Sequence, residues 1–160
     1  ECGMRDAGLT PVRRSRGEHA APPADTMILD TFGELSRVYA VGDIAFIGNS
    51  MVAPGGGQNL LQPLAQGKGV LFGPYMNNFR DAVAIALESG VGWRVETAVD
   101  LGDAVLAALR DPDRRQRVSA DALALVAANR GASVRYAAEL AALLENAPAP
   151  RQTGQDGSNA

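Results

Sequence analysis

The residues best suited to chemistry form a glycine-rich loop that follows a short apolar run. The run at 43–47 is rich in β-branched and aromatic side chains, which is typical of a buried strand. The loop contains Gly55, Gly56 and Gly57 in succession, and a leucine-rich helical pattern begins beyond Asn59. The order strand, glycine loop, helix start places backbone N–H groups and a helix N-terminus at one point. This arrangement predicts a site for an anion such as a phosphate.

The glycine loop matches neither of two common phosphate-binding motifs. Gly67 and Lys68 lack the earlier glycine of a P-loop, and Gly69 stands where that motif needs Ser or Thr. Leu60 occupies the position of the third glycine in the dinucleotide-binding fingerprint. Taken alone, the loop could equally be a surface loop without a ligand, so its interpretation depends on the loops around it.

Strand and helix patterns alternate through the first two thirds of the chain. This alternation predicts βαβ units and an α/β fold with a Rossmann-like parallel sheet and flanking helices. The expected strands are 9–15, 26–29, 43–47, 70–72 and 91–95, and the expected helices between them are 34–40, 59–66 and 78–89.

Three of the expected strands are followed by loops of unusual composition, at 30–34, 48–58 and 73–78. Because ligands of parallel sheets bind at the carboxyl ends of the strands, we expect all three loops on one edge of one sheet. Together they predict a cleft for a sugar or nucleotide, whose hydroxyl groups need polar partners. The side chains expected in this cleft are Phe32, Glu34, Ser50 and Asn59.

The remainder of the ordered chain is predicted to be helical. Thr97 and Asp100 have the spacing of a capping box, and Asp111-Pro112 is typical of a second helix start. The expected inner face of that second helix is Val118, Ala122, Leu125 and Val126. A third helix is expected over 132–145, followed by a disordered tail at 147–160, so that 1–146 form the single predicted domain.

Composition excludes several classes of function. The 160 residues carry a net charge of −3, which offers no basic surface for nucleic acid. One cysteine, Cys2, and one histidine, His19, cannot build a metal cluster, so we expect no metal and no cofactor. No apolar run is long enough for a transmembrane helix, so a soluble protein is expected. The chain begins in what reads as the end of a helix, and we expect a partial chain.

Taken in order, these motifs resemble a known family. The series comprises residues 30–35, 39–40, 43–48, Ser50, Gly56-Gly57, Asn59, Pro63, Gly73-Pro74 and Asn78-Phe79. It resembles the C-terminal half of 3-deoxy-D-manno-octulosonic acid (Kdo) transferases, over roughly residues 5–145. Similar residues of that family also fall at 14–17, at Leu109 and Asp111, and at 129–132.

The resemblance implies a fold and an activity. It implies the C-terminal donor domain of a GT-B glycosyltransferase, lacking its first strands, which binds the nucleotide sugar CMP-Kdo. The resemblance implies a separate N-terminal domain that these residues do not include. That domain is expected to carry the binding site for the lipid A precursor, the catalytic carboxylate and the membrane-binding region. The implied process is lipopolysaccharide biosynthesis, on the cytoplasmic side of the inner membrane. No catalytic residue is therefore expected in this chain.

The resemblance also implies donor-binding residues. The segment Thr31, Phe32, Gly33 and Glu34 matches the family segment that lines the base, and Phe32 could stack on cytosine. Ser50, Gly56 and Gly57 match the loop beside the phosphate, with Asn59 at the helix start and Gln62 near the sugar.

Three positions depart from the family pattern. Asn49 replaces a usual glycine, Gln58 a frequent histidine, and Gln62 a usual glutamate that accepts hydrogen bonds from sugar hydroxyls. Glutamine accepts more weakly because it is neutral. These departures leave two possibilities open, a donor other than CMP-Kdo and a divergent member of the family. Two other functions also stay open: a GT-B-fold nucleotide-sugar epimerase, and a nucleotide-binding module without catalysis.

Overall fold

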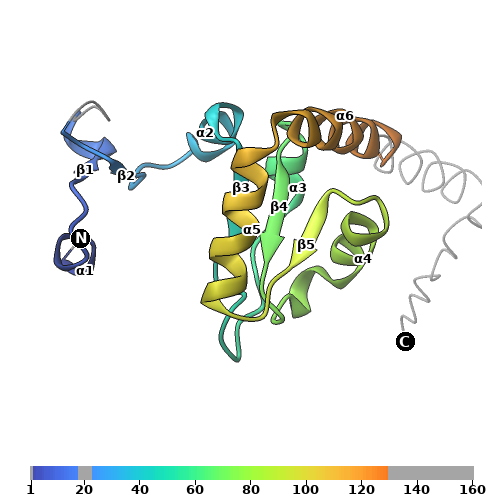
Figure 1. Ribbon diagram of the computed structural model, residues 1–160, viewed down its shortest axis with the longest axis horizontal. Coiled ribbons are helices and arrows are strands. Elements are labelled where there is room, and N and C mark those ends of the chain that lie inside the picture. Colours follow the sequence, from blue (N-terminus) through green and yellow to red (C-terminus); the bar gives the residue numbers. More distant parts are fainter. Residues whose placement is uncertain (1, 18–22, 130–160) are drawn as a thin grey trace, which may run out of the picture. The chain divides into compact units, whose positions relative to one another are not determined.

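The computed structural model describes residues 2–17 and 23–129 (Figure 1). The described helices are α1 (Cys2–Asp6), α2 (Leu35–Val41), α3 (Leu61–Leu64), α4 (Arg80–Glu88), α5 (Ala98–Arg110) and α6 (Pro112–Asn129). The first of the chain's two compact units ends at Val126, so α6 runs past its end. The described strands are β1 (Pro11–Arg13), β2 (Thr26–Ile28), β3 (Ile44–Ile47), β4 (Gly69–Phe72) and β5 (Gly92–Arg94). Two 3-10 turns, η1 (Arg14–Arg16) and η2 (Asn77–Phe79), complete the described elements.

The strands form two parallel sheets. One sheet pairs β1 with β2, and the other has the order β3-β4-β5. The predicted α/β class with parallel strands is confirmed. The prediction that three consecutive strands share one sheet is wrong, because β2 pairs with β1 instead of joining β3. Apolar patterns identify strands but do not identify their partners, so the 30–34 loop follows a strand of a different sheet.

The core lies on one face of the β3-β4-β5 sheet. All four residues of β4 are buried, as expected for the central strand of a parallel sheet. Ile47, Val70 and Phe72 pack there with Leu60 and Leu64 from the α3 region. The predicted inner face of α6 is confirmed, since Ala122 is buried and the other three side chains pack against this core: Val118, Leu125 and Val126.

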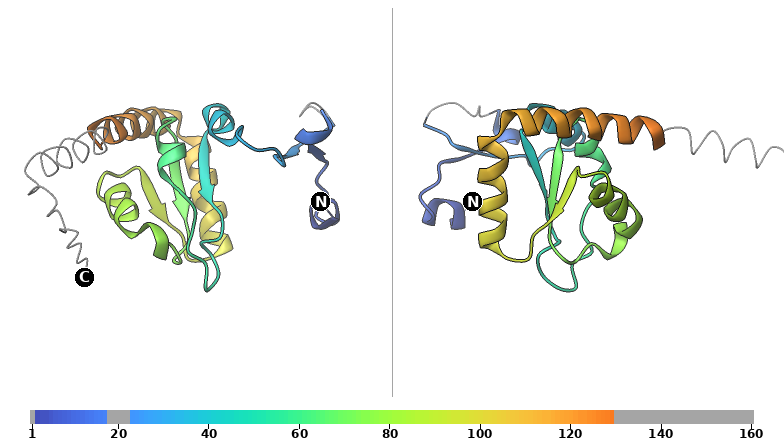
Figure 2. Two further views of the ribbon diagram at one scale, coloured as in Figure 1. Left: turned by 180° about the vertical axis from the view of Figure 1, so that it is seen from behind. Right: turned by 45° about the vertical axis from the view of Figure 1, so that its right-hand side comes forward.

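Helix α5 lies on the opposite face of this sheet from α3 and α4 (Figure 2). Its start is fixed locally: the Thr97 hydroxyl accepts from the Asp100 N–H, and the Asp100 carboxylate accepts from the Thr97 N–H. The predicted capping box is therefore confirmed. Asp111 caps α6 in the predicted way by accepting from the Arg114 N–H at 2.8 Å.

Helix α3 is shorter than the predicted helix 59–66. At its start the Asn59 side chain accepts from the Leu61 N–H at 2.9 Å, so the helix begins after Asn59 instead of at it. At its end Gly67 has φ 67°, a left-handed conformation that turns the chain into β4.

Several predictions fall outside the described residues. These are the third helix at 132–145, the tail at 147–160, the motif beyond Asn129 and the loop position of His19. Within 2–17 and 23–129, no helix has the length and hydropathy needed to cross a bilayer.

Candidate functional site

Two loops are joined at the carboxyl ends of β3 and β4. We call residues 48–58 the glycine loop and residues 73–78 the Tyr75 loop. The Tyr75 N–H donates to the Ser50 carbonyl at 2.9 Å, and the Gly56 N–H donates to the Tyr75 carbonyl at 3.0 Å. The predicted meeting of these two loops on one sheet edge is confirmed, and their relative position is fixed by backbone hydrogen bonds.

Ser50 holds the bases of both loops together. Its side chain is fully buried. The hydroxyl donates to the Ile47 carbonyl at 2.5 Å and accepts from the Gly73 N–H at 2.8 Å. The sequence pointed to Ser50 as a residue beside the phosphate. In the structure its hydroxyl is inside the protein, so any effect on a ligand acts through the shape of the loops.

The glycines of the loop are required by backbone conformation and by close packing. Gly56 and Gly57 have φ values of 121° and 74°, which disfavour any side chain. A Cβ on Gly56 would lie 2.6 Å from the Asn78 amide nitrogen, and one on Gly57 would collide with the Met76 side chain. Both glycines are buried where the two loops touch.

The N–H groups of these two glycines are already used by the protein. That of Gly56 donates to Tyr75, and that of Gly57 donates to the Asn49 carbonyl at 3.0 Å. The expectation that they would be free for an anion is therefore wrong for this structure. Among the described residues, the next two along the chain, Gln58 and Asn59, are exposed, and their backbone N–H groups have no protein acceptor.

Asn59 and Gln62 lie at the start of α3. The Asn59 oxygen caps the helix through Leu61, which leaves its amide N–H₂ at the surface. Gln62 is exposed on the first turn. The sequence also predicted a helix N-terminus that favours an anion, but the four residues of α3 are too few to build up an appreciable helix dipole. The polar groups at this point are therefore two side-chain amides and two backbone N–H groups.

The 30–34 loop forms a separate polar group at the end of β2. The Glu34 carboxylate accepts from Arg14 Nη2 at 2.9 Å and Nε at 3.3 Å, and it also accepts from the Thr31 hydroxyl. The hydrogen bonds from Arg14 and then from Thr31 lower the pKa of Glu34. Glu34 is consequently a fixed, ionised acceptor at neutral pH.

Phe32 stands at the tip of this loop. The residue is fully exposed, while Gly33 takes φ 82° beside it. A fully exposed phenylalanine gains nothing from the core and offers a whole ring face for stacking. The 30–34 loop thus carries one exposed aromatic ring and one carboxylate.

Asp30 fixes the base of the same loop. It accepts from the Ser15 hydroxyl at 2.7 Å, the Ser15 N–H at 2.9 Å and Arg13 Nη1 at 3.1 Å. The bonds from Ser15 lower the pKa of Asp30 to about 2.

Arg14 and Asp30 were not singled out from the sequence as site residues, although charged residues follow both strands. The signal that identifies them is the parallel pairing of β1 with β2, because it puts both strand ends on one edge.

The structure therefore divides the predicted residues into two groups. The glycine loop, the Tyr75 loop and the start of α3 bring together Ser50, Gly56, Gly57, Asn59 and Gln62. The 30–34 loop brings together Thr31, Phe32, Gly33 and Glu34 with Arg14. Within the described ranges, no three His, Cys, Asp or Glu side chains are grouped to hold a metal ion.

These features define a class of protein. Polar loops at the carboxyl ends of parallel strands are the features at which α/β domains commonly bind ligands such as nucleotides. No protein-family model matches the sequence.

Individual relatives narrow the class. The chain is 40% identical over 133 residues to a 3-deoxy-D-manno-octulosonic acid transferase of Bordetella pertussis, covering 82% of this chain and 31% of the relative. It is 35% identical over 125 residues to the transferase of that name from Haemophilus influenzae, covering 78% and 29%. The chain thus spans about a third of the length of these relatives.

A solved structure agrees with the sequence relatives. The C-terminal CMP-Kdo binding domain of WaaA from Acinetobacter baumannii is 28% identical and superposes with a TM-score of 0.72. The match covers 77% of this chain and 64% of that domain. The chain is a homologue of 3-deoxy-D-manno-octulosonic acid transferases and corresponds to part of their C-terminal domain.

Proposed function

We propose that these 160 residues supply the donor-binding part of a glycosyltransferase that transfers Kdo from CMP-Kdo to a lipid A precursor. The observation that carries the proposal is the likeness, in both sequence and fold, to a domain known to bind CMP-Kdo. The joined glycine and Tyr75 loops support it, because they lie where α/β domains hold nucleotides.

The exposed groups at the start of α3 suit the phosphate and sugar of the donor. The N–H groups of Gln58 and Asn59 can donate to phosphate oxygens, and the amides of Asn59 and Gln62 can pair with hydroxyls. Fixed donors around a departing phosphate stabilise the charge that develops on it. Ser50, Gly56 and Gly57 act indirectly by holding the loops in shape.

The 30–34 loop suits the base. Phe32 offers a ring for stacking, and the ionised Glu34 can accept from an exocyclic amino group such as that of cytosine. Arg14 and Thr31 keep the Glu34 side chain in one orientation. This part of the proposal predicts a preference for CMP over UMP, since uracil has a carbonyl where cytosine has the amino group.

The proposal extends to the whole enzyme through its relatives. It places the acceptor site and the catalytic base on a second domain of a GT-B fold, which works on the cytoplasmic face of the inner membrane in lipopolysaccharide biosynthesis. The donor domain contributes binding and leaving-group stabilisation, and the second domain deprotonates the acceptor hydroxyl.

Titration with CMP, followed by amide NMR shifts, tests the proposal. We expect saturable shifts at Phe32, Glu34, Gln58, Asn59 and Gln62, and weaker shifts with UMP. Shifts restricted to α5 and α6 would contradict the site, and tighter binding of UMP than CMP would contradict the donor class.

A further inference from the structure

A cavity lies on the other side of the β3-β4-β5 sheet from the core. It has a volume of about 140 Å³ and is lined by the β3-β4-β5 sheet, α5 and the start of α6. Its apolar lining comes from the sheet and from a row of alanines on α5: Ile44, Leu71, Trp93, Val118, Ala104, Ala107 and Ala108. The small alanine side chains leave space between α5 and the sheet.

The cavity is separate from the candidate donor site. Asp43, Ile44 and Gly69 in its lining lie at the amino ends of β3 and β4. The glycine and Tyr75 loops follow the carboxyl ends of the same strands, after Ile47 and Phe72. A ligand of this cavity would therefore not occupy the loops assigned to the donor.

Gly69 leaves room for the side chains that form one wall of this cavity. A Cβ at position 69 would lie 2.8 Å from Trp93 Cζ3 and 3.1 Å from Val118 Cγ1. The missing side chain lets the indole of Trp93 lie against the sheet, where it forms a flat apolar wall.

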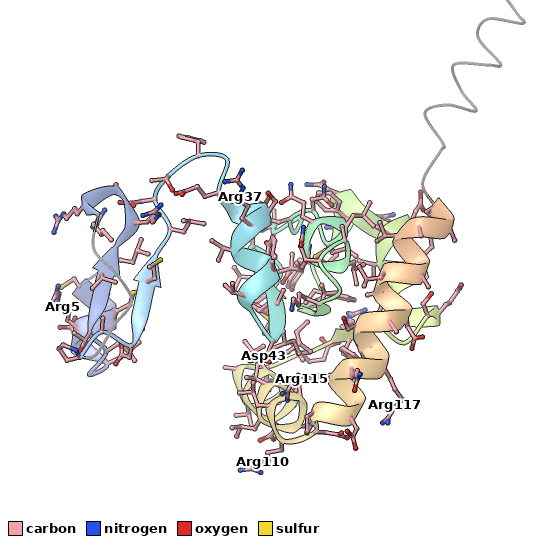
Figure 3. All side chains as sticks on the ribbon, turned by 90° about the horizontal axis from the view of Figure 1, so that it is seen from above. Arg5, Arg37, Asp43, Arg110, Arg115 and Arg117 are labelled. Atoms are coloured by element: carbon pink, nitrogen blue, oxygen red, sulfur yellow. The ribbon has the colours of Figure 1, made fainter. Side chains whose placement is uncertain are left out.

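The charged groups at the cavity are two arginines and one aspartate. Arg115 is engaged through two of its three side-chain nitrogens: its Nε pairs with Asp43 at 3.3 Å, and its Nη1 donates to the Ala108 and Leu109 carbonyls at 2.7 Å each. Figure 3 shows Asp43 and Arg115 together, with Arg110 lying apart from them.

Arg114 is the available cation at the cavity. Its guanidinium carbon lies 5.0 Å from the centre of the Trp93 ring, and no carboxylate pairs with it among the described residues. Because Arg115 pairs with Asp43, no carboxylate in the lining compensates the positive charge of Arg114, which lies beside an apolar space. This combination favours an anion with an apolar body.

We propose that this cavity binds a small apolar monocarboxylate, with its body against Trp93 and the alanines and its carboxylate on Arg114. The size fits a single ring, since an apolar cavity of about 150 Å³ holds benzene. The planar fork of Arg114 matches a carboxylate in bidentate geometry.

Benzoate is a suitable probe, and Trp93 is a specific reporter because the chain has one tryptophan. We expect saturable changes in Trp93 fluorescence, excited beyond the benzoate absorption, and amide NMR shifts at Ala104, Ala107 and Ala108. Benzyl alcohol, which has the same body without the charge, should bind about tenfold more weakly. Saturating CMP should leave benzoate affinity unchanged, so this proposal and the donor assignment fail independently.

Two variants test the two halves of the site. Arg114→Gln should weaken benzoate about tenfold and leave benzyl alcohol unchanged, whereas Arg110→Gln, on the exposed end of α5, should alter neither. Ala104→Leu should fill the cavity and abolish binding of both probes, with far-UV circular dichroism confirming the fold. Absence of saturable binding to the wild-type chain overturns the proposal without any variant. Equal effects of Arg114→Gln and Arg110→Gln, or full binding by folded Ala104→Leu, also overturn it.

Discussion

At the scale of single residues, Ser50 does more for the architecture than for the ligand. Its buried hydroxyl both donates and accepts, which ties the glycine loop to the start of the Tyr75 loop. Removing it takes the acceptor from the buried Gly73 N–H and one hydrogen bond from the Ile47 carbonyl, and an unsatisfied buried group costs about 1–3 kcal/mol. The loop geometry therefore depends on one hydroxyl group.

Ser50→Ala should lower the free energy of unfolding by about 1–3 kcal/mol in urea denaturation. Ser36→Ala, on the exposed surface of α2, is the matched control and should change it by less than about 0.5 kcal/mol. If both variants unfold at the same urea concentration, the assigned role of Ser50 is wrong.

The pKa of Asp30 is a second residue-scale quantity. Ser15 holds it at about 2, below the ordinary value of 3.8, so folding favours the ionised carboxylate. The resulting stabilisation is fully present above the ordinary pKa and is lost as the pH falls through about 2. Carboxyl carbon NMR should show an Asp30 midpoint near 2, and Ser15→Ala should move it upwards. A wild-type midpoint at the ordinary value would contradict the assigned hydrogen bonds, and Ser36→Ala should leave the midpoint unchanged.

Gln62 tests the sugar contact. A charged hydrogen bond contributes about 1.5–3 kcal/mol, against roughly 1 for a neutral one, so Gln62→Glu should tighten CMP-Kdo binding by up to about tenfold. The affinity for CMP alone should stay nearly constant, and calorimetry on both ligands separates the two. Repulsion from the phosphate or the Kdo carboxylate opposes the gain.

Gln66→Glu makes the same change at an exposed position beyond α3 and serves as the control. Equal effects of Gln62→Glu on CMP and CMP-Kdo would show that residue 62 does not contact the sugar.

At the scale of elements, one glycine cannot accept a side chain and another can. Gly57 has φ 74°, and a Cβ there would meet Met76, whereas a Cβ on Gly102 in α5 would meet nothing within 4 Å. Gly57→Ala should destabilise the fold by about 1–3 kcal/mol. Gly102→Ala should stabilise it by about 0.5–1 kcal/mol, because glycine is a poor helix former.

Thermal unfolding of both alanine variants, beside the wild type, measures the contrast. CMP titration adds a second readout, since Gly57→Ala should also weaken CMP if the loop shape matters for binding. A stabilised Gly57→Ala variant would mean that the glycine loop does not have the described conformation.

The sequence predicted those structural features that depend on residues close by in the chain. It did not predict the features that depend on residues far away in the chain. The capping box of Thr97 and Asp100 and the cap at Asp111 depend on neighbours within three residues, so their spacing was sufficient. The short α3 depends on how the chain turns into β4 at Gly67, which no periodicity reveals. The partner of β2 depends on tertiary pairing, and the apolar pattern is silent on it.

At the scale of the whole molecule, the contrast between local and long-range contacts also explains how much of the candidate site could be predicted. The ordered series of motifs indicated the family, and the relatives agree with that resemblance. The meeting of the glycine and Tyr75 loops followed from the rule for parallel sheets. Only the three-dimensional structure shows that the Gly56 and Gly57 N–H groups donate within the protein. It also shows that Arg14 pairs with Glu34. Sequence therefore located the loops, and structure showed which of their groups are available.

The whole-molecule prediction is binding without turnover. The chain aligns with 31% of the Bordetella pertussis transferase, and the resemblance assigns the acceptor site and the base to other parts of such enzymes. A positioned base contributes about 10²–10⁴ to a rate, and holding the acceptor beside the donor corresponds to an effective concentration of up to about 10⁵–10⁸ M. With both contributions missing, these 160 residues should bind CMP-Kdo and transfer no Kdo to a lipid A precursor above the uncatalysed rate.

Calorimetry establishes the binding, and mass spectrometry of the lipid product measures transfer, with the full-length Bordetella pertussis enzyme as the positive control. Transfer by the chain alone would show that a catalytic base and an acceptor site lie within these residues. Absence of CMP-Kdo binding, with the fold intact by circular dichroism, would contradict the donor assignment instead. The two readouts thus separate the division of labour between domains from the identity of the ligand.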